Sequence, residues 1–155
     1  MAQLPSGEIA LDASFVIALV GSVRPAQRFT SVLSRGVLFA PTLGEVVYKL
    51  RQRSNVPPSA TARFLQSLGT RVDVLAPRAA LLFADFKALD ALSTAAQQAA
   101  GVSNPKSLSF ADICCLAAAQ DAGLPVLTGD TQWTTLAAYG LSVAVFDFRD
   151  PTLTS

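Results

Sequence analysis

The sequence predicts a three-layer α/β/α sandwich around a short parallel sheet, folded as a single domain. Stretches with the composition of strands alternate with helical stretches along the whole chain. The strand-like stretches are mostly apolar throughout, as expected of parallel strands whose two faces are both covered. The length of 155 residues fits one domain, and 51% hydrophobic residues against 15% charged residues can fill its core.

Five short apolar segments of strand length define the predicted sheet. We expect strands at residues 8–11, 37–40, 72–75, 125–128 and 142–148. The first strand ends at Asp12, and the fourth leads through a turn at Gly129 to Asp130. The carboxyl ends of parallel strands therefore carry two acidic residues.

Prolines that open helices and glycines that close them mark most of the helix boundaries. We expect helices at residues 14–20, 25–34, 41 to at least 53, 58–69, 77–100, 109–122 and 131–139. The third of these places Leu43, Val46, Val47 and Leu50 on one face. Residues 101–108 read as a polar loop, and residues 1–7 and 151–155 as loose termini of the domain.

The composition excludes several kinds of chemistry. The chain has no histidine, which rules out Ser-His-Asp and Cys-His triads, imidazole zinc sites and histidine-pair ribonuclease chemistry. The net charge of +1 means that any site for a polyanion must be local. The two cysteines, Cys114 and Cys115, are adjacent in an apolar run, so they favour buried packing over a disulfide, redox or metal role.

The N-terminal region predicts a cytoplasmic protein without a membrane segment. It lacks the basic segment followed by an apolar core that marks a secretory signal. Its longest apolar stretch, residues 13–23, is shorter than the roughly 20 residues that cross a bilayer.

Four acidic residues lie at element boundaries where they could share one site. Asp12 and Asp130 follow strands, and ligands of parallel sheets collect beyond the carboxyl ends of the strands. Asp112 lies in the first turn of a predicted helix, and Glu45 lies one turn into another. Clustered carboxylates repel one another unless a cation holds them, and Mg²⁺ prefers oxygen ligands. Such a site can polarise a phosphodiester and activate a water without histidine.

Each acid also has a purely structural interpretation. Asp12 and Asp130 could cap the helices that follow them. Ser109 and Asp112 have the spacing of a capping box, and Glu45 and Lys49 that of a helical ion pair. These alternatives stay open at the level of the sequence.

The order and spacing of four segments resemble the PIN-domain family, and most closely VapC-type toxins. The segments are LDASFVIALV, PTLGEVVYKL and LSFADICCLAAAQDAGLPVLTGD, followed by Trp133, and the likeness runs from about residue 9 to 148. The resemblance implies a PIN-like sandwich and a Mg²⁺- or Mn²⁺-dependent endoribonuclease that hydrolyses phosphodiester bonds in RNA, commonly tRNA. It matches Asp12, Glu45, Asp112 and Asp130 to the family's metal-binding and catalytic acids, and Ser14 and Thr128 to hydroxyl residues that support the pocket.

Two positions depart from the family pattern. Ile113 stands where many relatives carry a basic residue, which puts a phosphate or partner contact in doubt. Gln132 stands where some relatives carry a further acid, which puts a second metal ion in doubt.

The predicted mechanism assigns roles to these residues and to nearby cations. Asp12, Asp112 and Asp130 would hold the metal, and Glu45 would orient or deprotonate the attacking water, leaving a 3′-hydroxyl and a 5′-phosphate. Possible RNA contacts are Lys49, Arg51, Arg53 and Lys106, with the alternative that these are ordinary solvated charges.

The resemblance also implies two protein partners, a second copy of the chain and a cognate VapB-like antitoxin. Apolar helices at residues 15–20 and 64–68 would supply the surface for either. An antitoxin that places a cation in the acidic pocket would inhibit by displacing the metal.

Three other interpretations remain. A catalytically degenerate PIN fold would act only as a binding scaffold. An aspartyl phosphatase of the haloacid dehalogenase type needs a second Asp two residues after the first, where this chain has Ser14. A phosphoacceptor receiver domain needs an acidic pair near the end of the first strand, which Leu11-Asp12-Ala13 does not provide.

Overall fold

A five-stranded parallel sheet forms the centre of the computed structural model, which describes residues 2–155. The strands are β1 (Ile9–Leu11), β2 (Gly36–Phe39), β3 (Arg71–Asp73), β4 (Val126–Thr128) and β5 (Val145–Asp147), in the order β3-β2-β1-β4-β5. The central strand β1 pairs with β2 on one side and with β4 on the other. This architecture confirms the predicted fold class, and it makes β1 and β4 neighbours.

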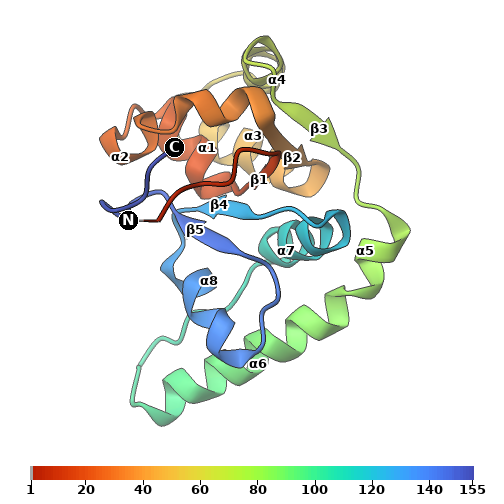
Figure 1. Cartoon of the computed structure of the whole chain (residues 1–155), viewed down its shortest axis with the longest axis vertical. Helices are drawn as coiled ribbons and strands as arrows, with labels where there is room; N and C mark the ends of the chain where they lie inside the picture. Colours follow the sequence, from red (N-terminus) through yellow and green to blue (C-terminus); the bar gives the residue numbers. More distant parts are fainter. Residues whose placement is uncertain (1) are drawn as a thin grey trace.

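Helices cover both faces of the sheet and complete the three layers (Figure 1). The first layer contains α1 (Ala13–Val20), α2 (Arg24–Gln27), the 3-10 helix η1 (Thr30–Arg35), α3 (Ala40–Ser54) and α4 (Pro58–Ser67). The second contains α5 (Pro77–Leu81), α6 (Phe83–Ala99), α7 (Phe110–Ala122), α8 (Thr131–Thr135) and the 3-10 helix η2 (Leu136–Tyr139). Within residues 2–155 no helix is both long and apolar enough to cross a lipid bilayer.

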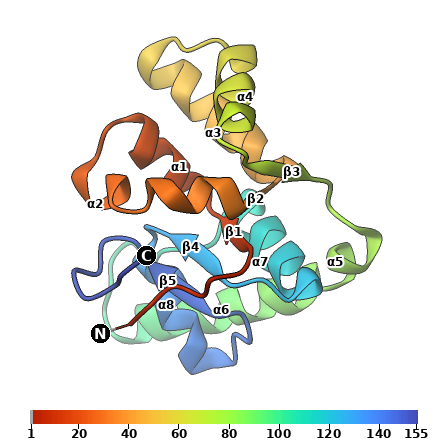
Figure 2. The same ribbon diagram turned by 45° about the horizontal axis from the view of Figure 1, so that its top comes forward.

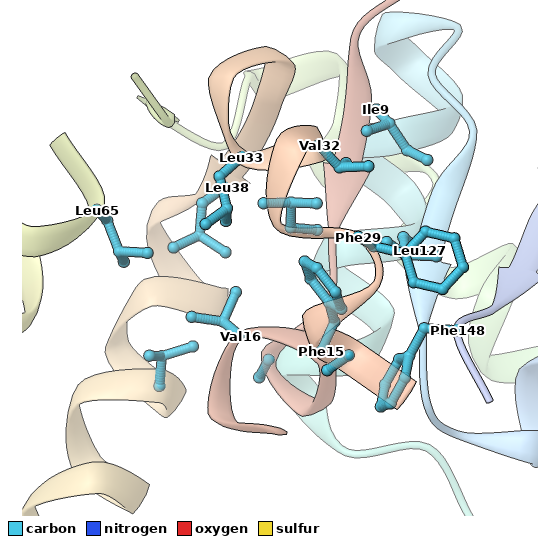
Figure 3. Packing of buried hydrophobic residues seen from close by; sticks show 14 of the residues in the cluster. Ile9, Phe15, Val16, Phe29, Val32, Leu33, Leu38, Leu65, Leu127 and Phe148 are labelled. Atoms are coloured by element: carbon cyan, nitrogen blue, oxygen red, sulfur yellow. The ribbon is translucent and has the colours of Figure 1, made fainter. Parts of the chain in front are cut away.

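Alternate strand residues feed two separate hydrophobic cores, one on each face of the sheet. Ile9 and Leu11 of β1 point into the first core, and Ala10 between them points into the second. The first core, shown in Figure 3, includes Phe15, whose ring packs against Phe148 at 5.6 Å between centroids. Much of the apolar surface of α1 is therefore used within the domain.

The edge strand β3 departs from the prediction that the strands are covered on both faces. Val72 is 39% exposed, and Val74, just beyond the strand, is 79% exposed. Among the described strands β3 pairs only with β2, and Arg71 of β3 makes ion pairs with Glu8 and Asp73. The expectation of two-sided burial fails here because β3 is at the end of the sheet.

Three predicted helices are not continuous α-helices. The helix expected at residues 131–139 is α-helical over α8 and continues as the 3-10 helix η2. The helix expected at residues 25–34 splits into α2 and η1, where the hydroxyls of Thr30 and Ser34 donate to backbone carbonyls and compete with helical bonding. The helix expected at 77–100 breaks at Leu82, between α5 and α6 (Figure 2).

Residues 2–4 and 153–154 make ordered contacts, although the sequence suggested loose termini at 1–7 and 151–155; Met1 lies outside the described residues. Gln3 forms a parallel bridge with Thr154, and the Leu4 amide donates to the Thr154 carbonyl at 2.9 Å. Leu4 and Leu153 are both buried, and the Arg28 guanidinium donates to the Leu153 carbonyl. The tails lie against each other because each contributes one leucine to the first core.

Candidate metal centre

The site lies at the carboxyl ends of β1 and β4, where the strand order brings two chain segments together. Leu11 is in register with Leu127, so Asp12 follows β1 beside the place where Thr128 ends β4. The Asp12 amide also donates to the Leu127 carbonyl at 3.0 Å. The juxtaposition of these two strand ends follows directly from the parallel pairing.

Asp12 is the most deeply buried of the four acids, with 3% of its surface exposed. It caps α1, and its Oδ2 accepts hydrogen bonds from the Ser14 amide, the Ser14 hydroxyl and the Thr128 hydroxyl, the last at 2.8 Å. Burial raises the pKa of Asp12, and the hydrogen bonds from Ser14 and Thr128 oppose that rise. All the hydrogen bonds from Ser14 and Thr128 fall on the one oxygen Oδ2.

Hydroxyl groups join the end of β4 to Asp12. The Thr128 hydroxyl accepts a hydrogen bond from the Asp130 amide at 2.9 Å while it donates to Asp12. The Gly129 amide donates to the Ser14 hydroxyl at 2.8 Å. Ser14 and Thr128 thus fix the relation between Asp12 and the Asp130 turn, whether or not they touch a ligand.

Asp112 forms the capping box that its spacing suggested. Its Oδ2 accepts from the Ser109 amide at 2.7 Å, and the Ser109 hydroxyl accepts from the Asp112 amide at 3.2 Å. Burial raises the pKa of Asp112 to about 6, opposed by the bonds from Ser109 and assisted by the charges of Asp12 and Glu45. The structural and the functional interpretation therefore both apply to this residue.

Glu45 lies within α3 and is half-buried. Burial and the nearby charge of Asp12 raise the pKa of Glu45, and Lys49 lowers it. Among the described residues Glu45 and Lys49 do not come within ion-pair distance, although they are spaced one helical turn apart. Glu45 is thus electrostatically coupled to Asp12 more strongly than to the lysine on its own helix.

Asp130 caps the short helix α8, as its position after β4 allowed. Its Oδ1 accepts from the Gln132 amide at 2.9 Å. One carboxylate oxygen is committed to this cap, and the residue still lines the same cavity as the other three acids.

A cavity of about 470 Å³ unites the four predicted acids. Asp12, Glu45, Asp112 and Asp130 all line it, although they come from four distant parts of the chain. Its wall has an apolar side formed mainly by α1, and it also includes the polar residues Ser14, Lys49, Arg53, Ser54 and Ser109. Lys49 and Arg53 of α3 therefore form a cationic flank beside the four acids.

Two of the predicted RNA contacts lie elsewhere. Arg51 lines a separate small hollow with Pro57 and Pro58, and Lys106 lines a second cavity between α6 and α8. Neither borders the acidic cavity, because Arg51 is half a helical turn from Arg53 and the backbone of Lys106 is bonded to Gln97.

The donor set fits a hydrated divalent ion. All the acids supply carboxylate oxygens, and Asp12, Glu45 and Asp112 each have a raised pKa, so their anions are poorly stabilised without a cation. Within residues 2–155 no three Asp, Glu, Cys or His side chains converge closely enough to enclose a bare ion. Mg²⁺ usually keeps several waters and takes one or two carboxylates directly, so oxygen donors around a cavity are the kind of ligand that it uses.

Gln132 does not extend the acidic cavity. It is buried, and its side-chain amide donates to the Lys106 carbonyl at 3.0 Å and to Asp90 at 3.4 Å. Asp90 is a buried acid that is not among the residues predicted from the sequence. Its signal was present, since Phe86, Asp90 and Ser93 share the buried face of α6 and place a carboxyl group within an apolar stripe.

The cysteines pack in the interior, as predicted. Cys114 and Cys115 are both buried, unpaired thiols. Burial raises the pKa of the Cys115 thiol well above its usual value, so this side chain is kept neutral.

The fold and the site together define a class of protein, an α/β sandwich with an acidic cavity at the carboxyl edge of its parallel sheet. A family model described as "PIN domain" matches residues 9–139. The chain belongs to the PIN domain family, which confirms the resemblance seen in the sequence.

Solved structures of toxin–antitoxin proteins share this fold. VapC20 from Mycobacterium tuberculosis, described as a toxin that cleaves the sarcin–ricin loop, is 22% identical, with 86% of this chain and 96% of that chain covered and a TM-score of 0.55. DNA-bound VapBC from Salmonella typhimurium matches at 16% identity, with 92% and 98% covered and a TM-score of 0.59.

FitAcB from Neisseria gonorrhoeae matches at 22% identity, with 90% and 97% covered and a TM-score of 0.58. A search of curated protein sequences found no significant match. These likenesses establish the fold, and they cover nearly the whole length of each neighbour.

Proposed function

We propose that this chain is a Mg²⁺- or Mn²⁺-dependent endoribonuclease and the toxin of a VapBC-type pair. The observation that carries the proposal is the convergence of Asp12, Glu45, Asp112 and Asp130 on one cavity of a PIN domain. The toxin descriptions of the structural neighbours support the same biological role.

Asp12, Asp112 and Asp130 would hold the metal, directly or through its waters. When bound, the ion would polarise the phosphodiester and increase the acidity of an attacking water. Asp12 would offer Oδ1, because Ser14 and Thr128 hold Oδ2. Ser109 would keep the Asp112 carboxylate in place through the capping box.

Glu45 would accept the proton of the attacking water. Its pKa is raised by burial and by Asp12, so its carboxylate is a stronger base than that of an ordinary glutamate. Attack on phosphorus would release a 3′-hydroxyl and leave a 5′-phosphate on the other fragment.

The RNA would approach along the cationic flank. Lys49 and Arg53 line the cavity and would bind backbone phosphates, giving affinity and salt dependence without base selectivity. The proposed substrate class is structured RNA, tRNA included; one structural neighbour is described as cleaving the sarcin–ricin loop.

A VapB-like antitoxin and a second copy of the chain are the proposed protein partners, and the cytoplasm the proposed location. The apolar side of the acidic cavity includes Ile17, Val20 and Val23, and Val23 is 43% exposed. An antitoxin segment lying there would place its own side chains beside the acids. Co-expression with the adjacent small open reading frame should abolish toxicity. The molar mass in solution of this chain, alone and with the antitoxin, tests whether it forms a dimer.

The direct test is RNA cleavage by the purified protein with Mg²⁺ or Mn²⁺. Asp12→Asn should lower the rate of RNA cleavage by about 100-fold or more, because the loss of one group essential to a reaction usually slows it by that factor. Asp121→Asn is a matched control, because Asp121 pairs with Arg78 and does not line the cavity. Full activity in excess chelator, or in Asp12→Asn, would reject the metal mechanism.

One observation favours a second candidate, a PIN fold that only binds RNA or protein. Within residues 2–155, no group of three carboxylates lies close enough together to bind one metal ion directly. In that case wild type and Asp12→Asn would bind RNA equally, and neither would cleave it with any divalent metal.

A further inference from the structure

A buried carboxylate outside the acidic cavity organises the segments that carry two of the acids. Asp90, in α6, is 3% exposed, and it does not line the acidic cavity. Four groups donate to it. Oδ1 accepts from the Leu108 amide at 2.8 Å and the Gln132 side-chain amide at 3.4 Å, and Oδ2 accepts from the Ser107 hydroxyl at 2.7 Å and the Lys87 ammonium at 3.3 Å.

The first connection runs from Asp90 to Asp112. Asp90 holds both residues that precede Ser109, through the Ser107 hydroxyl and the Leu108 amide. Ser109 in turn bonds Asp112 in both directions of the capping box. The exposed polar loop at residues 101–107 therefore becomes fixed just before the helix that carries Asp112.

The second connection runs from Asp90 to Asp130 through Gln132. The Gln132 backbone amide donates to the Asp130 carboxylate at 2.9 Å, and its side chain donates to Asp90 and to the Lys106 carbonyl. Gln132 is itself only 6% exposed, so these bonds form in the interior, where hydrogen bonds to charged groups are strong. One carboxylate thus links the segment before Asp112 to the segment after Asp130.

We propose that Asp90 is a positioning residue for the metal centre, acting through Ser109 on Asp112 and through Gln132 on Asp130. The inference rests on the proposed function for its catalytic consequence, while the linkage itself is a property of the fold. Nuclease sites tolerate little displacement, since an error of about 1 Å can lower a rate by roughly 100-fold.

The test compares Asp90→Asn with wild type and with Asp85→Asn, which removes an exposed acid from the same helix. An asparagine has nearly the same volume, but its NH₂ group cannot accept the hydrogen bonds that a carboxylate oxygen of Asp90 accepts. We expect kcat for RNA cleavage to fall about tenfold to 100-fold, with KM changed less than about twofold. Assays at 20 °C, with folding checked by circular dichroism, separate this effect from lost stability.

Amide hydrogen exchange provides a second measurement that does not depend on activity. In Asp90→Asn the amides at 107–112 and 130–132 should exchange at least about tenfold faster, while those of β1 and β4 stay protected. Asp85→Asn should leave both segments unchanged. If Asp90→Asn does not fold, Ser107→Ala, which removes one of the four bonds, should increase exchange at 107–112 and lower kcat about threefold.

The outcomes separate the two proposals. Faster exchange in both segments together with a lower kcat supports the positioning role. Unchanged exchange in either segment, or a kcat equal to that of Asp85→Asn, overturns it. If wild type cleaves no RNA with any metal, the proposed function fails, and the exchange data alone still decide whether Asp90 links the two segments.

Discussion

The carboxylates of Asp12 and Asp112 are less stable as anions in this fold than they are in water. Burial at the end of β1 raises the pKa of Asp12. Burial also raises the pKa of Asp112, and the charges of Asp12 and Glu45 add to that rise. The cation proposed for this site would stabilise both carboxylates as anions.

Asp112→Asn should stabilise the metal-free protein at neutral pH. The pKa of Asp112 rises from 3.8 to about 6 on folding, so the folded state binds more protons in this range and the free energy of unfolding falls as pH rises through it. The cost at pH 7 is at most about 3 kcal/mol, and partial exposure reduces it. Urea unfolding in chelator should show a gain of about 1–3 kcal/mol at pH 7 and almost none at pH 4. An equal gain at both pH values would contradict this account.

The four acids were visible in the sequence because their positions followed from strand ends and helix starts. Asp90 was not selected, although its spacing places it on the apolar face of α6, because its contacts with a loop and with Gln132 form only in the folded chain. Arg51 and Lys106 were assigned to the rim on closeness in sequence, and helix rotation and loop bonding place them elsewhere.

The elements that matter most for the site are the short turns after β1 and β4. Gly129 lies against the Phe148 ring so closely that a Cβ at this position would overlap it. Its amide also donates to Ser14, which bonds Asp12. The turn therefore couples the packing of the first core to the geometry of the acids.

Gly129→Ala should destabilise the protein by about 1–3 kcal/mol, as overpacked sites usually do, and should lower cleavage by displacing Asp130. Gly44→Ala is the matched control, because its Cβ would meet nothing within 4 Å. That change within α3 should stabilise the helix by about 0.5–1 kcal/mol. Thermal unfolding of both variants measures the contrast, and similar melting temperatures would refute it.

At the same scale, the sequence predicted the type and order of the strands and main helices but not all their boundaries. Apolar runs and proline or glycine at the ends were sufficient for β1, β2, β4 and α7. The interruption at Leu82 and the 3-10 conformation of η1 depend on tertiary packing and on hydroxyl–backbone bonds, which carry no periodic signal.

For the whole molecule, the two terminal segments close the first core. Gln3 pairs with Thr154, and Leu4 and Leu153 are buried beside Phe15 and Phe148 in the same cluster. Contacts between the ends of a chain are not apparent in local patterns, which is why the sequence suggested loose tails. The pairing ties the region before β1 to the region after β5.

Leu153→Ala should therefore lower the free energy of unfolding by about 2–4 kcal/mol, as for other buried leucines. Leu81→Ala serves as the control, since Leu81 is 79% exposed and should change stability by less than about 0.5 kcal/mol. Chemical denaturation gives both values. A loss at Leu153 no larger than that at Leu81 would mean that the tail does not hold the core in solution.

The most direct measurement of the central claim is Mn²⁺ binding by titration calorimetry at pH 7. Wild type should bind the ion, and more tightly at pH 7 than at pH 5, because burial raises the pKa of Asp112 to about 6 and a proton on that carboxyl group competes with the ion. Single changes of Asp12 and Asp112 to asparagine should each weaken binding by at least about tenfold, and Asp121→Asn should not. Equal affinity in wild type and both cavity variants would contradict a metal centre built from these carboxylates.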